Sequence, residues 1–391
     1  MTISYAGNFA RLLLRWKGSI WKSVWKELTT FLVIYYLVRM IYKLALNADQ
    51  KKTFEELAIQ CDGYTKNIPL TFLLGFYIAA IVKRWWAQFE WVAWPDDLLS
   101  LLCTVLPGDD PQSQLQRHTV ARYVLLTAAL AWRDVSIKVR GRFPSIDHLV
   151  NAGLMTQQER KLYDAVKVES VRWFLPLQWV QRMVQQQLRD GAVSGPIACM
   201  FLSELGNYRL CFRKLYCYDW VCIPLVYTQV AALSTYGYFV FCLIGRQFLE
   251  TRQVDLYLPV FTIVQFLFYV GWFKVGQDLM RPFGTDDDDI ELNYILDRHI
   301  QAAFAIVGAA HEQQPPVVAD KLFESNRAVQ SVPHTKMSAK IKEHPPKLHA
   351  QIKVSSADDS SWQETVNLSP LNEPATHARM FKKQHRPYIN W

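Results

Sequence analysis

Four stretches of the chain are apolar enough and long enough to cross a lipid bilayer, which requires about 20 mostly apolar residues. They lie at residues 29–46, 68–82, 221–244 and 256–273. The last two contain no charged residue, and the second reaches spanning length only with the RWWAQFEW that follows it. We interpret Trp85, Trp86, Trp91 and Trp94 as an aromatic belt at a membrane interface. The pattern predicts a polytopic helical membrane protein.

Between the second and third spans, apolar residues recur at helical spacing over a long polar segment, as in HTVARYVLLTAALAWRDV. This predicts a helical domain outside the membrane. The segment between the first two spans, residues 47–67, is mixed and slightly acidic and is predicted to be an external loop. The resulting division is 1–28 as an amphipathic N-terminal segment, 29–96 as the first two spans, 97–220 as the helical domain, 221–280 as the last two spans, 281–311 as an acidic segment with a following helix, and 312–391 as a mostly disordered tail.

The N-terminal segment alternates basic residues with Trp16, Ile20, Trp21 and Trp25. Such a helix can lie in the headgroup plane of a membrane, and an equally good alternative is a helix packed on the helical domain with its aromatic side chains buried. Its apolar core is interrupted by Arg and Lys, so we expect no cleaved signal peptide.

Lysine and arginine gather before the first and third spans and after the second and fourth. By the positive-inside rule, these flanks, the helical domain and both termini are predicted to be cytoplasmic. We expect an integral membrane protein that lies in the plasma membrane.

Composition agrees with this assignment and excludes several classes. The chain has 391 residues, 51% of them apolar, with 14 tryptophans, which disfavours a soluble protein. Its seven cysteines form no CxxC pair, so we interpret them as reduced. No catalytic triad, zinc spacing or phosphate loop is present, so we predict no enzyme. The net charge of +8 suits cytoplasmic flanks and attraction of small anions, and it requires no nucleic acid partner.

Acidic residues are concentrated shortly after the fourth span, in RPFGTDDDDIEL at residues 281–292. One interpretation is a solvated helix start, with Thr285 as cap and carboxylates in the first turn, where the helix dipole favours them. The other is a site for a hard cation such as calcium, which takes oxygen ligands. Asp286 and Asp289 would point the same way on a first helical turn. The spacing is not that of an EF-hand, so backbone oxygens would have to complete the coordination.

Several long segments resemble, in order, those of the bestrophins: LLLRWKGSIWK, IPLTFLLGFYIAAIVKRWWAQFEWVAWPD, GRFPSIDHLVNAGLMT, YDWVCIPLVYTQV and VGWFKVGQDLMRPFGTDDDDIELNYILDRH. The resemblance covers roughly residues 1–305. It implies an all-α fold with four transmembrane helices per subunit and a cytosolic helical domain, assembled as a homopentameric channel around one axial pore. The implied activity is a calcium-activated anion channel that conducts chloride, with bicarbonate as a further candidate, and that lies in contact with membrane lipid.

The resemblance also supplies pore residues. Ile68, Phe72 and Phe76, spaced by four, match the hydrophobic neck of the family and would lie on one helical stripe. An apolar ring of this kind can gate by dewetting. The alternative is a stripe that faces lipid or packs on another helix. A second constriction is implied at Ile197, after the proline of SGPIACMFLSEL, although the segment is shorter here than in the family; the alternative for Ile197 is core packing.

The same resemblance implies that the acidic run is part of a calcium-binding site, the calcium clasp. Asp286 and Asp289 match its two side-chain ligands, and Asp287 and Asp288 would support them. Backbone carbonyls would come from Asp278 and Arg281 and from an N-terminal residue that corresponds to Ala6. The chain departs from the family by carrying charged residues at 278 and 281, by Thr285 in place of an acid, and by a shorter N-terminus.

Two other classes remain open. A non-conducting membrane scaffold that regulates other channels or transporters would have the same hydropathy. A secondary anion transporter would be expected to contain internal repeats, and the sequence shows none.

Overall fold

The computed structural model describes residues 12–249, 257–313 and 315–320, together with Thr335 and Met337. The chain divides into two compact units, Met1–Pro316 and Val317–Trp391. In the described part of the first unit the regular elements are helices and no strand occurs, which confirms the predicted all-α fold.

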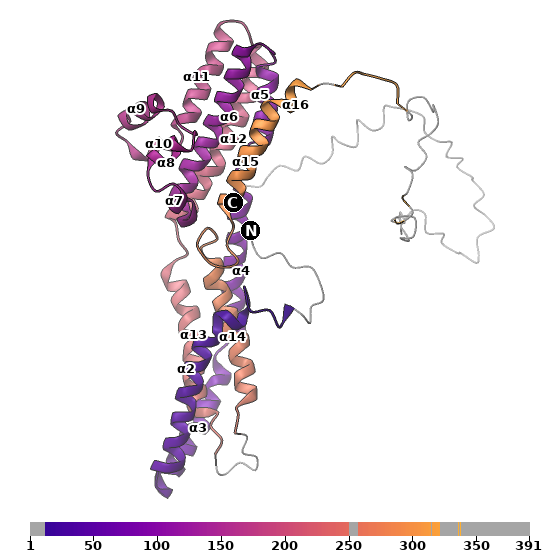
Figure 1. The fold of residues 1–391 in the computed structure, drawn as a ribbon. Coiled ribbons are helices and arrows are strands. Elements are labelled where there is room, and N and C mark those ends of the chain that lie inside the picture. Colours follow the sequence, from indigo (N-terminus) through magenta and orange to yellow (C-terminus); the bar gives the residue numbers. More distant parts are fainter. Residues whose placement is uncertain (1–11, 250–256, 314, 321–334, 336, 338–391) are drawn as a thin grey trace, which may run out of the picture. The chain divides into compact units, whose positions relative to one another are not determined.

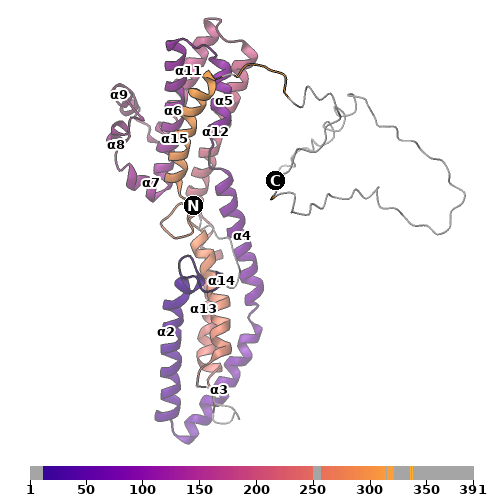
Figure 2. The ribbon, with the colours of Figure 1, turned by 45° about the vertical axis from the view of Figure 1, so that its right-hand side comes forward.

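Four helices of this unit are long and apolar enough to cross a membrane, as the hydropathy pattern predicted. They are α2 (Ile20–Met40) with its π-helical continuation (Ile41–Ala45), α4 (Leu70–Glu90), α13 (Leu225–Gly245) and α14 (Val260–Leu279). The four helices form one bundle with α3 (Ala48–Asn67), as Figures 1 and 2 show.

The first membrane helix begins at Ile20, earlier than the predicted span. Ser19 is its N-cap and accepts a hydrogen bond from the Lys22 backbone N–H at 3.4 Å, while Gly18 turns the chain with φ of 65°. Residues 20–28, the C-terminal part of the predicted amphipathic segment 1–28, form the first turns of α2, whereas residues 1–11 of that segment lie outside the described residues. Val24 is buried there, whereas Trp21 and Trp25 are 41% and 47% exposed.

The segment 47–67, predicted to be a loop, is instead helical, since Ala48–Asn67 form helix α3. Asn47 and Gln50 make a capping box at its start, a signal that the hydropathy pattern alone does not reveal. α3 packs along α13, and the contact is close because a Cβ at Gly245 would lie 2.6 Å from the Asp62 backbone nitrogen. A mixed polar sequence thus folds as a helix because tertiary contact with α13 stabilises it.

Aromatic side chains fill the centre of the membrane bundle. The Phe31 ring lies 4.9 Å from that of Phe266, which in turn lies 4.7 Å from that of Phe239. All three are almost fully buried and come from α2, α14 and α13. This cluster holds the three helices together along one side of the bundle.

The helical domain is built around a separate core, centred on the fully buried Trp132. Its principal helices are α5 (Asp96–Val105), α6 (Pro111–Val135), α11 (Leu175–Arg189), α12 (Gly195–Trp220) and α15 (Leu292–Val307). Shorter helices complete it: α7 (Ile137–Arg142), α8 (Ile146–Asn151), α9 (Gln157–Ala165), α10 (Glu169–Arg172) and α16 (Ala309–Glu312). Figure 1 shows the principal helices side by side.

The four tryptophans of the predicted aromatic belt differ in their surroundings. Trp85 and Trp91 pack against the core of the helical domain, whereas Trp86 and Trp94 are 53% and 50% exposed. The C-terminal end of α4 therefore reaches the helical domain. The seven cysteines are free thiols, as predicted.

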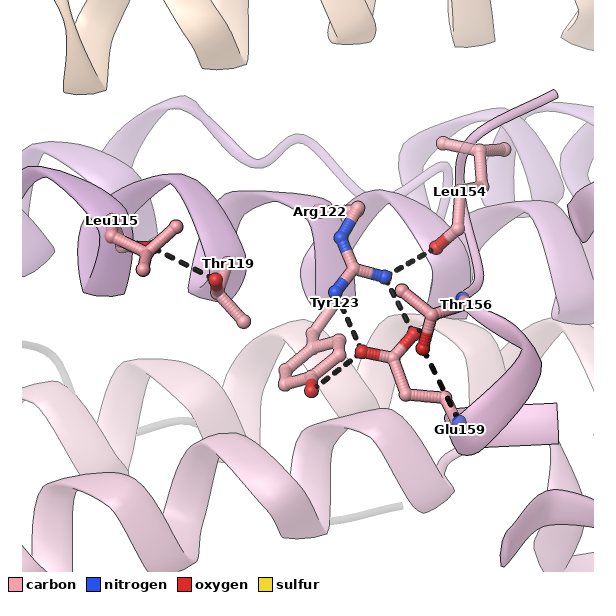
Figure 3. Close-up of polar contacts among 7 residues, drawn as sticks. All are labelled: Leu115, Thr119, Arg122, Tyr123, Leu154, Thr156 and Glu159. Carbon is pink, nitrogen blue, oxygen red and sulfur yellow. Dashed lines mark hydrogen bonds and ion pairs between the residues drawn. The ribbon is translucent and has the colours of Figure 1, made fainter. Parts of the chain in front are cut away.

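A buried ion pair fixes helix α9 to helix α6 (Figure 3). Both terminal guanidinium nitrogens of Arg122 donate to the Glu159 carboxylate at 2.6 Å, and the Tyr123 hydroxyl donates to it at 2.8 Å. Glu159 also accepts from the Thr156 backbone N–H at 2.8 Å. Burial alone would raise the pKa of Glu159, but these hydrogen bonds together lower it to about 2. The pair is ionised at neutral pH.

Replacing Glu159 with glutamine should destabilise the helical domain by roughly 3–5 kcal/mol, because the substitution leaves the Arg122 charge buried without its partner. The two side chains are only 12% and 11% exposed. Thermal unfolding of the purified protein measures the effect. Tyr123→Phe, which removes a single hydrogen bond, should cost about 1 kcal/mol. Equal losses for the two variants would contradict this account.

Candidate functional site

The acidic run lies in a closed loop between α14 and α15. The Ile290 backbone N–H donates to the Pro282 carbonyl at 2.8 Å, and the side chains of Phe283 and Ile290 are buried in the core of the helical domain. The Ser136 hydroxyl donates to the Phe283 carbonyl at 3.1 Å. These contacts fix both ends of the loop to the helical domain.

The predicted helix start at Thr285 is wrong. Residues 286–289 form turns, and α15 begins at Leu292 with Glu291 as its N-cap. The helix cannot extend back because burial of Ile290 and its hydrogen bond to Pro282 bend the chain there. The aspartates are therefore held by the loop and not by a helical turn.

Asp286 and Asp289 are brought together by a hydrogen bond between a backbone N–H and a carboxylate, and not by a shared helical turn. The Asp289 carboxylate is 3% exposed and accepts a hydrogen bond from the Asp286 backbone N–H at 2.6 Å. Burial and, to a smaller extent, the neighbouring Asp286 charge raise the pKa of Asp289 to about 6. A Cβ at Gly284 would lie 3.0 Å from the same carboxylate, so glycine permits this close approach. Asp289 is thus a carboxylate whose negative charge is poorly compensated by protein groups.

The start of α2 lies against this loop. The Lys22 ammonium is 2.5 Å from the Asp287 carboxylate, which also accepts from the Gly18 backbone N–H at 3.2 Å. The Lys22 hydrogen bond lowers the pKa of Asp287. The Ser23 hydroxyl donates to Asp278, near the end of α14, at 3.1 Å. Two segments far apart in the sequence are thereby joined.

These groups surround a cavity of about 270 Å³. Asp278 and the carboxylates of the acidic loop line it on one side, and Gly18, Ser19, Lys22 and Ser23 line it on the other. An oxygen-rich cavity of this kind suits a hard cation such as calcium. Among the residues that the structure describes, however, no three acidic, histidine or cysteine side chains come close enough together to hold a metal ion. The donor chemistry fits calcium, and main-chain oxygens would have to supply part of the coordination.

The structure describes the position of only some of the candidate carbonyl ligands. Asp278 lines the cavity. Arg281 is exposed just beyond α14, and its carbonyl accepts a hydrogen bond from the Gly284 N–H at 3.2 Å. Ala6 lies outside the described residues. Asp288 lines the cavity with an exposed side chain, whereas Asp287 is held by Lys22.

Lys22, Gly18 and Ser23 were missed by sequence reasoning. Their partners Asp287 and Asp278 lie more than 250 residues away along the chain. The available signal was the lysine one turn after the capping serine in GSIWK, which by itself indicates only a helix start.

The neck residues lie at the start of α4. Phe72 and Phe76 are 64% and 62% exposed, and their ring centroids are 4.7 Å apart in an edge-to-face arrangement. Ile68, by contrast, precedes the helix with extended backbone, because Pro69 is the N-cap and α4 starts at Leu70. The predicted stripe of three on one helix is therefore a stripe of two, with Ile68 placed by the α3–α4 junction.

Ile197 lies in the first turn of α12, directly after Pro196. Its side chain is partly buried against the core of the helical domain. The contact is of the kind expected from core packing, and the rest of the side chain remains exposed in the protomer.

The fold and the site define a class of protein: an α-helical integral membrane protein with four spans, an exposed phenylalanine pair on one of them, and an oxygen-lined cavity where the first and last spans meet the helical domain. The family model described as "Bestrophin, RFP-TM, chloride channel" matches residues 1–309. The chain belongs to the bestrophin family.

Curated relatives agree with this assignment. The chain is 50% identical over 423 residues to Bestrophin homolog 13 of Caenorhabditis elegans, with 100% of each protein covered. It is 41% identical over 357 residues to human Bestrophin-1, covering 88% of this chain and 61% of that protein.

Solved structures share the fold. A bacterial bestrophin homologue from Klebsiella pneumoniae aligns with a TM-score of 0.51 and 16% identity, over 76% of this chain and 100% of that one. A variant of the same bacterial protein aligns with a TM-score of 0.56 and 13% identity, over 73% and 99%. The family resemblance is confirmed, and the chain has the fold of a channel family rather than that of an enzyme.

Proposed function

We propose that this chain is one subunit of a calcium-activated chloride channel that assembles from five copies around an axial pore. The channel would lie in the plasma membrane with both termini cytoplasmic, since Lys and Arg flank the cytoplasmic ends of the spans. Bicarbonate is a second candidate permeant anion. The family match and the four spans support an anion channel, and the calcium dependence is the finer part of the proposal.

The observation that carries the calcium proposal is the cavity between the start of α2 and the acidic loop. Asp286 and Asp289 are the proposed side-chain ligands, and main-chain carbonyls of Asp278, Arg281 and the N-terminal segment around Ala6 would complete the oxygen set. A bound calcium ion would supply positive charge there. The protein would hold the buried Asp289 carboxylate in a position to coordinate the ion.

A route from this cavity to the pore helix follows from close helix contacts. A Cβ at Gly276 of α14 would lie 2.6 Å from Ile78 and 3.0 Å from Tyr77, both on α4. Tyr77 is adjacent in sequence to Phe76. A ligand that ties the end of α14 to the start of α2 can therefore bias the position of α4, provided that it binds one arrangement of these helices more tightly than the other.

The proposed gate is the ring that Phe72 and Phe76 of five subunits would form, with Ile68 beside it. Exposed apolar side chains around an axis can exclude water and so block ions without a charged plug. The positive edges of phenyl rings favour an anion over a cation. Ile197 would form a second narrow point in the helical domain, at the start of α12.

Currents through planar bilayers that contain the purified protein alone test this proposal. Under a chloride gradient, the reversal potential should follow that of chloride, and stepping calcium on the cytoplasmic side should raise the current at concentrations on the order of 10⁻⁷ to 10⁻⁵ M, the range of calcium sensors. A scaffold would carry no current, and a transporter would show a saturable flux without channel openings. Either result would overturn the proposal.

A further inference from the structure

A groove on the surface of the membrane bundle lies between α2, α13 and α14 and has a volume of about 360 Å³. Phe31, Phe239 and Phe266 line it with side chains that are almost fully buried, and Ile34, Val240 and Leu243 extend its apolar wall. All of these residues belong to membrane-spanning helices. The groove therefore opens toward the hydrocarbon of the bilayer or toward another protein surface.

One end of the groove carries a net positive charge. Lys26 and Glu27 both line that end. The Glu27 carboxylate is 2.5 Å from the Lys274 ammonium, so its charge is compensated within the bundle. Lys26 is exposed, and its ammonium lies 5.8 Å from the centre of the Trp25 ring. The charge that the groove presents at its mouth is thus that of Lys26.

The same end of the groove lies at the level of the lipid headgroups. Trp21 and Trp25 are exposed on the first two turns of α2, and exposed tryptophans gather where a membrane meets water. From Lys26 to Ile34 the helix rises about 12 Å, at 1.5 Å per residue. Half of a bilayer core is about 15 Å. The groove therefore runs through most of one leaflet, starting from its polar surface.

We infer that this groove is a binding site for one anionic phospholipid, whose acyl chain lies along Phe31, Phe239 and Phe266 and whose phosphate contacts Lys26. The apolar wall suits a hydrocarbon chain because contact between the two keeps apolar surface of both away from water. The lysine stem lies along the groove while its ammonium reaches the headgroups. A neighbouring copy would be a poorer occupant, because it would have to bring an anionic group to the membrane surface at the level of Lys26.

Native mass spectrometry of the purified protein, incubated in detergent with phosphatidylserine or phosphatidylcholine, tests this inference. The wild type should retain about fivefold more phosphatidylserine, the preference expected from one basic side chain near a membrane surface. Lys26→Gln should remove the preference. Lys52→Gln, which deletes another exposed lysine, near the start of α3, should keep it.

A second variant tests the apolar part of the site. Val240 is 57% exposed, so Val240→Trp can fill the groove without disturbing the buried core, and it should lower the retention of both lipids. An unchanged preference in Lys26→Gln, or unchanged lipid retention in a folded Val240→Trp protein, would overturn the assignment. Because lipid is counted directly, the outcome does not depend on whether the protein conducts chloride.

Discussion

Simultaneous replacement of Asp286 and Asp289 by asparagine should shift half-activation of the chloride current to a calcium concentration roughly 100-fold higher, because calcium affinity depends on the number of charged ligands in the site. In the wild type the backbone nitrogen of Asp286 is 2.6 Å from the Asp289 carboxylate. An asparagine side chain in place of Asp289 keeps an oxygen that can accept this hydrogen bond, so the loop should retain its fold. Patch recording of reconstituted protein with stepped cytoplasmic calcium gives the measurement.

Asp287→Asn is the matched control. Its carboxylate is held by Lys22 at 2.5 Å rather than by a partner within the loop, and its removal deletes the same charge from the same cavity. If only the charge of the cavity mattered, the control would shift activation as far as either single ligand variant. A small shift for Asp287→Asn beside a larger one for each of the single variants Asp286→Asn and Asp289→Asn supports the proposed ligands, and equal shifts would contradict them.

The sequence predicted the membrane helices well because the predicted spans 221–244 and 256–273 contain no charged residue, and charged residues count heavily against a span in a hydropathy window. Helix α3 escaped prediction because its side chains are mixed and its stability comes from α13, which the chain reaches more than 150 residues later. The early start of α2 depends on Ser19 as a cap, whereas other serines, such as Ser100 and Ser234, lie inside helices, so a serine alone does not mark a helix start.

The candidate site was predictable in its acidic half only. Four successive aspartates are visible in any reading of the sequence, but the loop that holds them is closed by the contact from Ile290 to Pro282 and by burial of Phe283. The Lys22 ion pair joins residues that no local pattern connects. Helical spacing likewise placed Ile68 with the phenylalanines, whereas Pro69 ends that relationship by starting the helix at Leu70.

The position of α14 gives a physical route by which the proposed calcium cavity could affect the proposed gate. Gly271 lets α14 approach Ile20 and Val24 of α2, and Gly276 lets it approach Ile78 of α4. Packed helices of this kind move as units, because side chains that interlock without voids transmit displacement. The other end of α4 is fixed to the helical domain, where the Arg84 guanidinium donates to the Tyr218 carbonyl of α12. A shift of α14 can therefore tilt α4 about that junction and displace the phenylalanines at its start.

If Phe72 and Phe76 form the gate, then replacing both with alanine should give chloride currents without calcium that are about as large as those of the wild type with calcium. Alanine removes the rings that exclude water, so the constriction stays wet in either arrangement of the helices. Both side chains are more than 60% exposed in the protomer, so their removal leaves no cavity in the bundle. The measurement is the ratio of currents in the absence and presence of calcium.

Phe261→Ala together with Phe268→Ala provides the control, because these two phenylalanines of α14 are 77% and 68% exposed and remove the same number of rings from the membrane surface. Their loss should leave calcium activation intact. Retained calcium dependence in the Phe72 and Phe76 variant would move the gate elsewhere, with Ile197 as the next candidate. Loss of calcium dependence in both pairs would instead show that exposed aromatic area stabilises the closed state in general, since Phe261 and Phe268 lie on α14, outside the proposed gate.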